Sequence, residues 1–308
     1  MASISGRVNE ANKYLENGHK FLRTGLLKWS PDHENAANQF KQAAMAYKGA
    51  GLHQKAIEAN ELAIKSYLAS QSSAFQAAKC MEQAALSAKE IGEIQLVSSY
   101  YMRAIDIYRT LGQLDTAITT MDRAAKALTE KMPTMAADIY IQASEACAIE
   151  DRYRQAAEFC NRAATLYVKA KEFRRAANIL KEEINCYTLA GDQRTCNKTA
   201  MGIILVHLAD KNIVGANEVL KTCPFDEDVF GLAQSLVSGY DKHDAKLLNS
   251  VLKNSFFRDL DTEYAKIARD LMNTHGKIVE SKKSTSPDNQ QQDDGIPDAD
   301  EDMLLWYC

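Results

Sequence analysis

Residues 151–210 repeat with a period of twenty residues. They divide into three consecutive lines, DRYRQAAEFCNRAATLYVKA, KEFRRAANILKEEINCYTLA and GDQRTCNKTAMGIILVHLAD. Each line has arginine at its fourth position and alanine or cysteine at its sixth, and its seventeenth position holds tyrosine or histidine. Self-similarity at a fixed period is typical of stacked units, because each unit is too small to bury its apolar face alone. We therefore expect the chain to fold as a repeat array.

The same period covers residues 31–222, in ten lines that begin at residues 31, 51, 72, 92, 112, 131, 151, 171, 191 and 211. At the sixth position, nine of the ten residues are alanine or cysteine: Ala36, Ala56, Ala77, Ala117, Ala136, Ala156, Ala176, Cys196 and Ala216, with Val97 as the tenth. The seventeenth position holds larger side chains in Tyr47, Tyr67, Tyr108, Leu128, Tyr167 and Tyr187. Small residues at a fixed point let helix axes approach closely, and large ones fill the grooves beside them.

The segments between line starts are expected to be helices. Only 14 glycines and 5 prolines interrupt the chain, and most line starts carry a turn signal such as Gly51, Gly92 or Asp151. About 16 helical residues per line make a rod of about 24 Å. Two lines form a hairpin of about 40 residues, similar to the 34-residue tetratricopeptide unit. We predict an all-α protein, a right-handed superhelix of such hairpins capped by a C-terminal helical bundle.

Four segments follow from this pattern: an N-terminal helix and apolar loop in residues 1–30, the hairpin array in 31–222, the bundle in 223–275 and a disordered acidic tail with an apolar end in 276–308. Ser30 and Pro31 are expected to cap and begin the second helix. The bundle is expected to hold three amphipathic helices, in residues 225–240, 243–252 and 256–272.

Charge and motifs exclude several classes of protein. The formal net charge is −4, and residues 276–308 carry three lysines against eight acidic residues, which leaves +1 for the body. We therefore expect no nucleic-acid partner, since such binders carry a dominant basic stripe. The sequence lacks phosphate-loop, dinucleotide-binding and paired zinc-ligand motifs, so we expect neither an enzyme nor a cofactor. It also lacks a stretch of about 20 apolar residues and a signal-peptide core, which predicts a cytoplasmic protein.

The loop before the array is apolar, with the sequence Leu26-Leu27-Lys28-Trp29, although loops are usually polar. One interpretation is that Leu26, Leu27 and Trp29 insert into a membrane interface, which contributes roughly 5 kcal/mol before losses. The other is a hydrophobic staple that folds back on the second helix. The sequence leaves both interpretations open.

Basic residues within the array are candidates for binding an acidic protein surface. They are Arg123, Lys126, Arg162, Lys169, Arg174, Arg175 and Lys181. The alternative is an ordinary solvated helix face, because Asp122, Glu158 and Glu172 partly cancel their charge.

The acidic tail ends in the apolar run Met303 to Cys308. A disordered arm of this kind can deliver a short hydrophobic peptide to a partner, which makes Leu304 and Leu305 candidate contacts. A frayed terminus is the alternative.

Four segments in this order resemble one protein family: TGLLKWSPD (24–32), TCNKTAMGIILVHL (195–208), GYDKHD (239–244) and LDTEYAKIA (260–268). Together they resemble the soluble attachment proteins for the N-ethylmaleimide-sensitive fusion (NSF) ATPase, most closely the gamma type, over nearly the whole chain. The resemblance implies an adaptor that binds assembled SNARE complexes, which are syntaxin-type four-helix bundles. It also implies recruitment of the hexameric NSF ATPase, which disassembles them in vesicle fusion and intracellular membrane traffic.

The resemblance further implies a peripheral protein on the cytosolic face of membranes, attached through Leu26, Leu27 and Trp29. It assigns ATPase contact to the C-terminal bundle and extreme C-terminus, where relatives have acids before a penultimate leucine. Tyr307 is penultimate here, so Leu304 and Leu305 are the nearest candidates. The family's SNARE-facing lysines match no motif of this chain, and the basic candidates rest on composition and spacing alone.

Two other classes stay open at this point. A generic tetratricopeptide-like scaffold, for instance a chaperone adaptor, would bind a peptide in one groove without any ATPase. A helical enzyme would need a catalytic residue such as His207, which instead occupies a tyrosine position among apolar neighbours and is expected to be a packed side chain.

Overall fold

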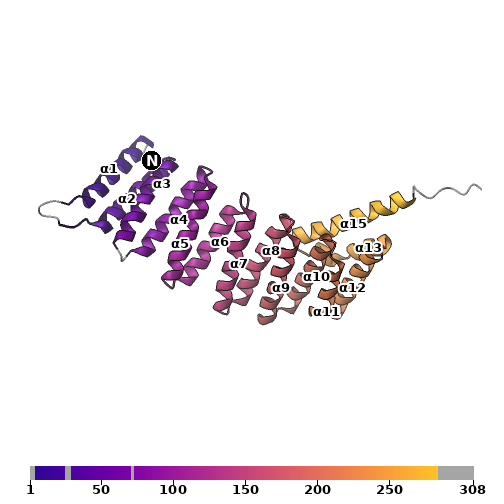
Figure 1. The fold of residues 1–308 in the computed structure, drawn as a ribbon. Helices are drawn as coiled ribbons and strands as arrows, with labels where there is room; N and C mark the ends of the chain where they lie inside the picture. Colours follow the sequence, from indigo (N-terminus) through magenta and orange to yellow (C-terminus); the bar gives the residue numbers. More distant parts are fainter. Residues whose placement is uncertain (1–3, 25–28, 71–72, 284–308) are drawn as a thin grey trace, which may run out of the picture.

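The computed structural model describes residues 4–24, 29–70 and 73–283, with side chains up to residue 274. Within these ranges the chain forms fifteen α-helices and no strand (Figure 1). Their bounds are α1 Ile4–Leu22, α2 His33–Gly49, α3 His53–Ala69, α4 Ala74–Glu90, α5 Ile94–Thr110, α6 Leu114–Leu128, α7 Pro133–Ile149, α8 Tyr153–Lys169, α9 Phe173–Leu189, α10 Gln193–Ala209, α11 Ile213–Thr222, α12 Glu227–Asp241, α13 Ala245–Leu252, α14 Ser255–Arg258 and α15 Thr262–Lys283. The prediction of an all-α protein is confirmed.

The ten lines of the repeat correspond to helices α2–α11, with one helix in each line. Helix α2 starts later than expected, because Asp32 caps it by accepting a hydrogen bond from the Asn35 amide. The prediction that Ser30 caps this helix and Pro31 begins it is therefore wrong by two residues. Pro133, by contrast, stands at the start of α7, where its missing amide hydrogen costs nothing.

Seven of the turns between these helices share one backbone geometry. In each, the first residue of the twenty-residue line has a positive φ angle: Gly51, Gly92, Gly112, Asp151, Lys171, Gly191 and Lys211. The next amide donates to the carbonyl five residues earlier, as Leu52 N does to Tyr47 O at 2.9 Å. This closure ends the helix and reverses the chain. The constant period of the sequence therefore reflects one repeated turn.

The sixth and seventeenth positions of the twenty-residue lines contribute to the core of the array. The sixth residue of every line, from Ala36 to Ala216, is fully buried, so neighbouring helices meet there at close range. At the seventeenth position, four tyrosines are buried and donate hydrogen bonds through their hydroxyl groups: Tyr47, Tyr67, Tyr108 and Tyr167. Tyr67 donates to Asn38 Oδ1 at 2.7 Å, and burial raises the pKa of Tyr67 to about 12. These phenols therefore remain neutral donors.

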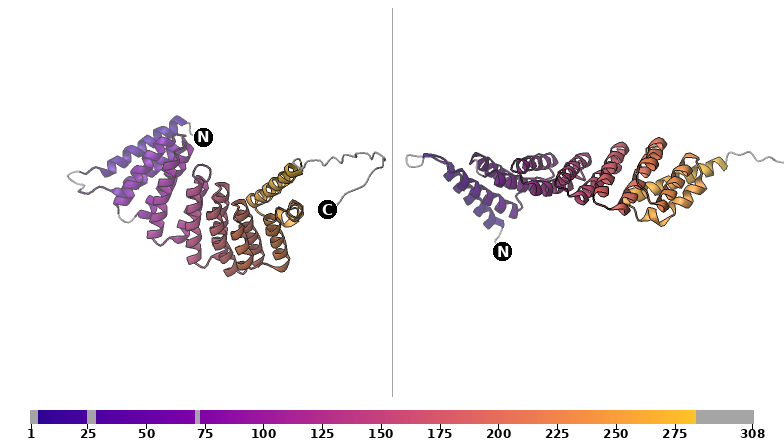
Figure 2. Two further views of the ribbon diagram at one scale, coloured as in Figure 1. Left: turned by 45° about the vertical axis from the view of Figure 1, so that its right-hand side comes forward. Right: turned by 90° about the horizontal axis from the view of Figure 1, so that it is seen from below.

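Consecutive helices pack against each other, and side-chain contacts also join helices two apart. Arg123 of α6 reaches Glu82 of α4 at 2.9 Å, and Tyr100 of α5 reaches Glu61 of α3 at 2.6 Å. The array therefore has two layers. We call α2, α4, α6, α8 and α10 the even layer, and α3, α5, α7, α9 and α11 the odd layer. Figures 1 and 2 show that the stacked hairpins form an elongated, curved body.

Helices α12–α15 close the C-terminal end of the array, where α15 contacts α8, α10 and α13. The third helix expected in this region is divided in two, because α14 ends at Arg258 and α15 starts at Thr262. Helix α15 continues to Lys283, so residues 276–283, which we expected to be part of the disordered tail, are helical. The run GKIVESKK contains no proline, and the first helix-breaking residue after it is Pro287.

Candidate protein-binding site

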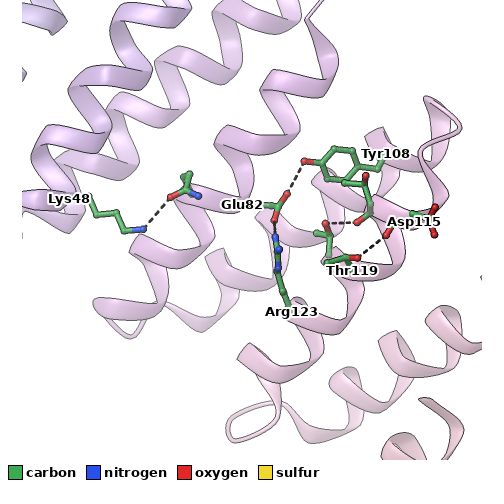
Figure 3. A network of polar contacts seen from close by, with 9 residues as sticks. Lys48, Glu82, Tyr108, Asp115, Thr119 and Arg123 are labelled. Atoms are coloured by element: carbon green, nitrogen blue, oxygen red, sulfur yellow. Dashed lines mark hydrogen bonds and ion pairs between the residues drawn. The ribbon is translucent and has the colours of Figure 1, made fainter. Parts of the chain in front are cut away.

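A row of polar contacts crosses the even layer, and each contact joins residues about one hairpin apart in the sequence. Figure 3 shows the part of the row around Lys48, Glu82 and Arg123. The contacts are Lys48 to Gln83 (3.2 Å), Arg123 to Glu82 (2.9 Å) and Arg162 to Asp122 (2.7 Å). We call these six residues the polar row. The row links α2 to α4, α4 to α6 and α6 to α8, and so ties the first four helices of the layer together.

Glu82 is the most buried carboxylate of the polar row, with 8% of its surface exposed. Both of its oxygens have donors: Oε1 accepts from the Tyr108 hydroxyl at 2.8 Å, and Oε2 accepts from Arg123 at 2.9 Å. Burial and the hydrogen bond to Glu82 raise the pKa of Tyr108. A buried carboxylate is stable only when it is paired in this way. Glu82 is therefore a structural residue with little capacity left for a partner.

Four of the basic candidates lie on the even layer, and each has an acidic neighbour. Arg123 and Arg162 belong to the polar row, and Lys126 pairs with Asp122 at 2.6 Å. Lys169, at the end of α8, lies 3.9 Å from Glu263 of α15. Arg123, Arg162 and Lys169 therefore connect helices of the protein itself, and Lys126 pairs within α6. The side chains of all four remain partly exposed to solvent.

The structure does not bring Arg174 and Arg175 into the polar row. Both lie at the start of α9, in the odd layer. Arg175 binds Asp138 at 2.6 Å and lies over the Tyr167 ring at 4.2 Å. Arg174 lies 3.6 Å from Asp210. The two arginines are therefore placed to stabilise the packing of α9 on its neighbours.

Three lysines that the sequence analysis did not single out lie on the even layer near its N-terminal end. Lys41 and Lys48 of α2 and Lys79 of α4 line one cleft of about 340 Å³ together with Arg123. Their helices, α2 and α4, belong to alternate lines of the repeat, so the sequence could have placed these three lysines on the same layer. Nothing in the sequence, however, indicates which cations lack an acidic neighbour, because those neighbours lie a hairpin away.

A second cleft of about 420 Å³ lies where α8, α9 and α10 meet the segment before α15. Glu183 lines it and is 1% exposed. Its Oε1 accepts from Thr199 at 2.9 Å and from Asn161 at 3.4 Å, and its Oε2 has no hydrogen-bond partner among the described residues. Burial raises the pKa of Glu183 to about 8.

Asn161 also donates to Asp261 at 3.0 Å. The junction between the array and the C-terminal helices is thus held by a small polar cluster around a carboxyl group that is largely protonated at neutral pH.

Comparison with known proteins identifies the family. The family model described as "Soluble NSF attachment protein, SNAP" matches residues 5–221, which run from α1 nearly to the end of α11. The chain belongs to the soluble NSF attachment protein family. The match covers the whole even layer with its polar row.

Two relatives of the chain are named gamma-soluble NSF attachment protein. The protein from Dictyostelium discoideum is 24% identical over 288 residues, which cover 92% of this chain and 89% of the relative. The protein from Arabidopsis thaliana is 25% identical over 291 residues, which cover 92% of this chain and 99% of the relative. The resemblance to the gamma type of the soluble NSF attachment proteins is therefore confirmed.

Among solved structures, the chain is similar to "Crystal structure of BtubC (BKLC) from P. vanneervenii". The two are 15% identical with a TM-score of 0.39, over 78% of this chain and 94% of that one. A similarity of this degree carries no argument about fold or function.

The loop that the family resemblance assigns to the membrane is partly described. Trp29 is 90% exposed, so the alternative that Trp29 folds back on α2 as a hydrophobic staple does not hold. The Asp32 amide donates to the Phe21 carbonyl at 3.0 Å, which ties the two ends of the loop together. Leu26 and Leu27 lie outside the described residues.

The tail residues Leu304 and Leu305 also lie outside the described residues. Within the part of the chain that is described, no group of three or more His, Cys, Asp or Glu residues could hold a metal ion. In the same residues, no helix is both long and apolar enough to cross a membrane. His207 is half-buried, and burial lowers its pKa, as expected for a packed histidine.

Proposed function

We propose that this protein is an adaptor that binds assembled SNARE complexes and recruits the hexameric NSF ATPase to disassemble them in membrane traffic. The observation that carries this proposal is the family match over residues 5–221. The relatives that span 92% of the chain bear the name of the same family. In this role the protein holds its partners in position, and the ATPase performs the chemical work.

The architecture supports a bridging role. The hairpin array is a continuous body in which every helix packs on the next, and an array of this kind offers an extended binding surface. We propose the even layer as the SNARE-binding face, with Arg123, Lys126, Arg162 and Lys169 at its charged positions. Arg174 and Arg175 lie on the other layer and would contribute to packing.

The two ends of the array carry the other proposed contacts. Trp29, with Leu26 and Leu27, would insert into the membrane interface, where tryptophan is favoured. The C-terminal helices and the tail residues Leu304 and Leu305 would contact the ATPase. This arrangement makes the protein peripheral to the cytosolic face of membranes.

A recruitment experiment tests the proposal. Assembled SNARE complexes are fixed to beads and incubated with the NSF ATPase in a non-hydrolysable nucleotide, with and without the full-length chain. We expect the ATPase to be retained only when the chain is present. Retention that is equal without the chain would contradict the proposed function, and binding of a C-terminal peptide with no ATPase dependence would favour the generic scaffold.

A further inference from the structure

Two cysteines of neighbouring helices lie against each other where α8 packs on α9. Cys160 of α8 has 4% of its surface exposed, Cys186 of α9 is partly exposed, and a hydrogen bond joins the two thiols. We call these two residues the cysteine pair. The Ser144 hydroxyl of α7 lies 3.1 Å from Cys160 Sγ and donates to the Ala156 carbonyl at 2.9 Å. Three consecutive helices therefore hold the pair in place.

The hydrogen bond gives the two thiols different acidities. It lowers the pKa of Cys186, against the opposing effects of burial and of the Glu182 charge. The same bond, together with burial, raises the pKa of Cys160. The thiolate is the form of cysteine that reacts with oxidants. Cys186 is therefore the more reactive and the more accessible thiol of the pair.

The other cysteines that the structure describes differ from Cys186 in acidity. Burial raises the pKa of each of them: Cys80, Cys147, Cys196 and Cys223. Cys223 is partly exposed like Cys186, so partial exposure does not by itself make a thiol of this chain more acidic. The contact with a second thiol is what distinguishes Cys186.

We propose that the cysteine pair is a site of reversible oxidation, at which a peroxide converts Cys160 and Cys186 into a disulfide, with Cys186 as the attacking thiol. An accessible, acidic cysteine beside a second thiol is the arrangement found in redox-sensing proteins. A disulfide places its Sγ atoms about 2 Å apart and its Cβ atoms within about 4.5 Å. Because the thiols already share a hydrogen bond, a small approach of α8 and α9 produces this geometry.

The oxidation proceeds in two steps. The Cys186 thiolate attacks one oxygen of hydrogen peroxide, the O–O bond breaks, and Cys186 becomes a sulfenic acid while the leaving hydroxide takes up a proton to form water. The Cys160 thiol then attacks the sulfenic sulfur. The S–S bond forms, the S–O bond breaks, and a second water leaves with the Cys160 proton. Two thiols are oxidised and the peroxide is reduced to water, and a dithiol reductant reverses the reaction by thiol–disulfide exchange.

The cysteine pair lies beside the junction between the array and the C-terminal helices. Asn161 and Tyr187, which follow Cys160 and Cys186 in the sequence, both line the cleft of about 420 Å³ at this junction. The disulfide therefore fixes α8 on α9 next to the place where the C-terminal helices attach. The modification needs no partner protein, so this inference goes beyond the proposed function and does not depend on it.

The experiment uses the reduced full-length chain, diluted to favour intramolecular reaction and treated with a low molar excess of hydrogen peroxide. Remaining thiols are blocked with N-ethylmaleimide in denaturant, and a tryptic digest is examined by mass spectrometry. Trypsin places the two cysteines in separate peptides, residues 155–162 and 182–194. We expect the cross-link between these peptides to be the main disulfide product and to disappear on reduction with dithiothreitol. Absence of this cross-link, or cross-links spread evenly over the cysteines, would overturn the proposal.

A second measurement on the parent protein tests the role of Cys186. Native, reduced protein is treated briefly with iodoacetamide, and the alkylation of each cysteine is followed by the same peptide analysis. We expect Cys186 to react about tenfold faster than Cys223, which is also partly exposed. A rate at Cys186 no higher than that at Cys223 contradicts its assignment as the attacking thiol.

The variant Cys160→Ala removes the second thiol, and Cys223→Ala is the matched control. In Cys160→Ala the sulfenic acid at Cys186 has no thiol to attack it, so its final yield, trapped with dimedone, should rise at least about fivefold. Cys223→Ala should form the cross-link to within about twofold of the parent yield. Unchanged dimedone labelling in folded Cys160→Ala would count against the pair. If that variant does not fold, as judged by circular dichroism, the two measurements on the parent protein decide.

Discussion

The stability of the folded protein is coupled to the protonation of Glu183. In the part of the chain that the structure describes, its buried Oε2 has no hydrogen-bond partner. The charged groups that line the same cleft from other elements are Glu158, Arg162, Lys198, Asp259 and Asp261. Burial raises the pKa of Glu183 from 4.5 to about 8. The folded state therefore binds a proton more tightly than the unfolded state, so this group lowers stability progressively as pH rises from about 4.5 to about 8.

The first prediction concerns this pH dependence. Glu183→Gln keeps the shape of the side chain and cannot ionise. We expect the variant to be more stable than the parent protein at pH 8 by up to a few kcal/mol, with the difference shrinking toward pH 5. Urea denaturation followed by circular dichroism over this pH range measures it. Glu182→Gln, at an exposed neighbouring position, is the control, and identical pH slopes for Glu183→Gln and the parent would contradict the account.

At the scale of single residues, the sequence predicts burial better than it predicts partners. Ala117 and Tyr108 occupy fixed positions of the repeat, so their burial follows from the period alone. The pairing of Arg123 with Glu82 joins residues 41 apart in the chain and becomes apparent only when alternate helices are placed side by side. For that reason the basic candidates were identified from the sequence, but the lysines without acidic neighbours were not.

The close packing of neighbouring helices depends on the small residues at the sixth position of each line. Ala117 of α6 is fully buried at the point where neighbouring helices approach closely. We expect Ala117→Leu to destabilise the array by about 1–3 kcal/mol, because the added atoms force the helices apart. Thr119→Leu, at an exposed position of the same helix, should stay within about 0.5 kcal/mol of the parent. Chemical denaturation measures both, and equal effects would show that the sixth position does not set the helix spacing.

For the loop between α1 and α2 we propose a separate role, at the membrane. Replacing Leu26, Leu27 and Trp29 with serine is expected to lower co-sedimentation with liposomes at least about fivefold, because their apolar area no longer enters the interface. Folding should be unaffected, since the Trp29 side chain is almost fully exposed. Ile149→Ser, at a 77% exposed position at the end of α7, is the matched control. A loss of SNARE disassembly in detergent equal to that on membranes would contradict the membrane role.

Most helices could be predicted from the sequence, because most line starts carry a turn signal, at intervals of about twenty residues. The prediction was weaker where the period ends. The break between α14 and α15 at Asp259–Asp261 lies within a run that is amphipathic throughout. The continuation of α15 to Lys283 differs from the prediction because polar composition suggested disorder, although no proline occurs before Pro287.

At the scale of the whole molecule, the array separates the two ends for which we propose different contacts. The exposed Trp29 belongs to the first connection of the chain, and α15 leaves the far end of the array (Figure 2). Between these ends, each helix of the array packs on the next. We therefore propose that the array is a spacer that holds a SNARE bundle along its even layer while its C-terminal end engages the ATPase.

The most direct test is the rate of SNARE-complex disassembly in the presence of the NSF ATPase and ATP, followed by loss of energy transfer between labelled SNARE helices. The account predicts rapid disassembly with the intact chain. It also predicts that a chain lacking Met303 to Cys308 still binds SNARE complexes but supports much slower disassembly. A rate with the intact chain no higher than that of the ATPase alone would contradict the central claim.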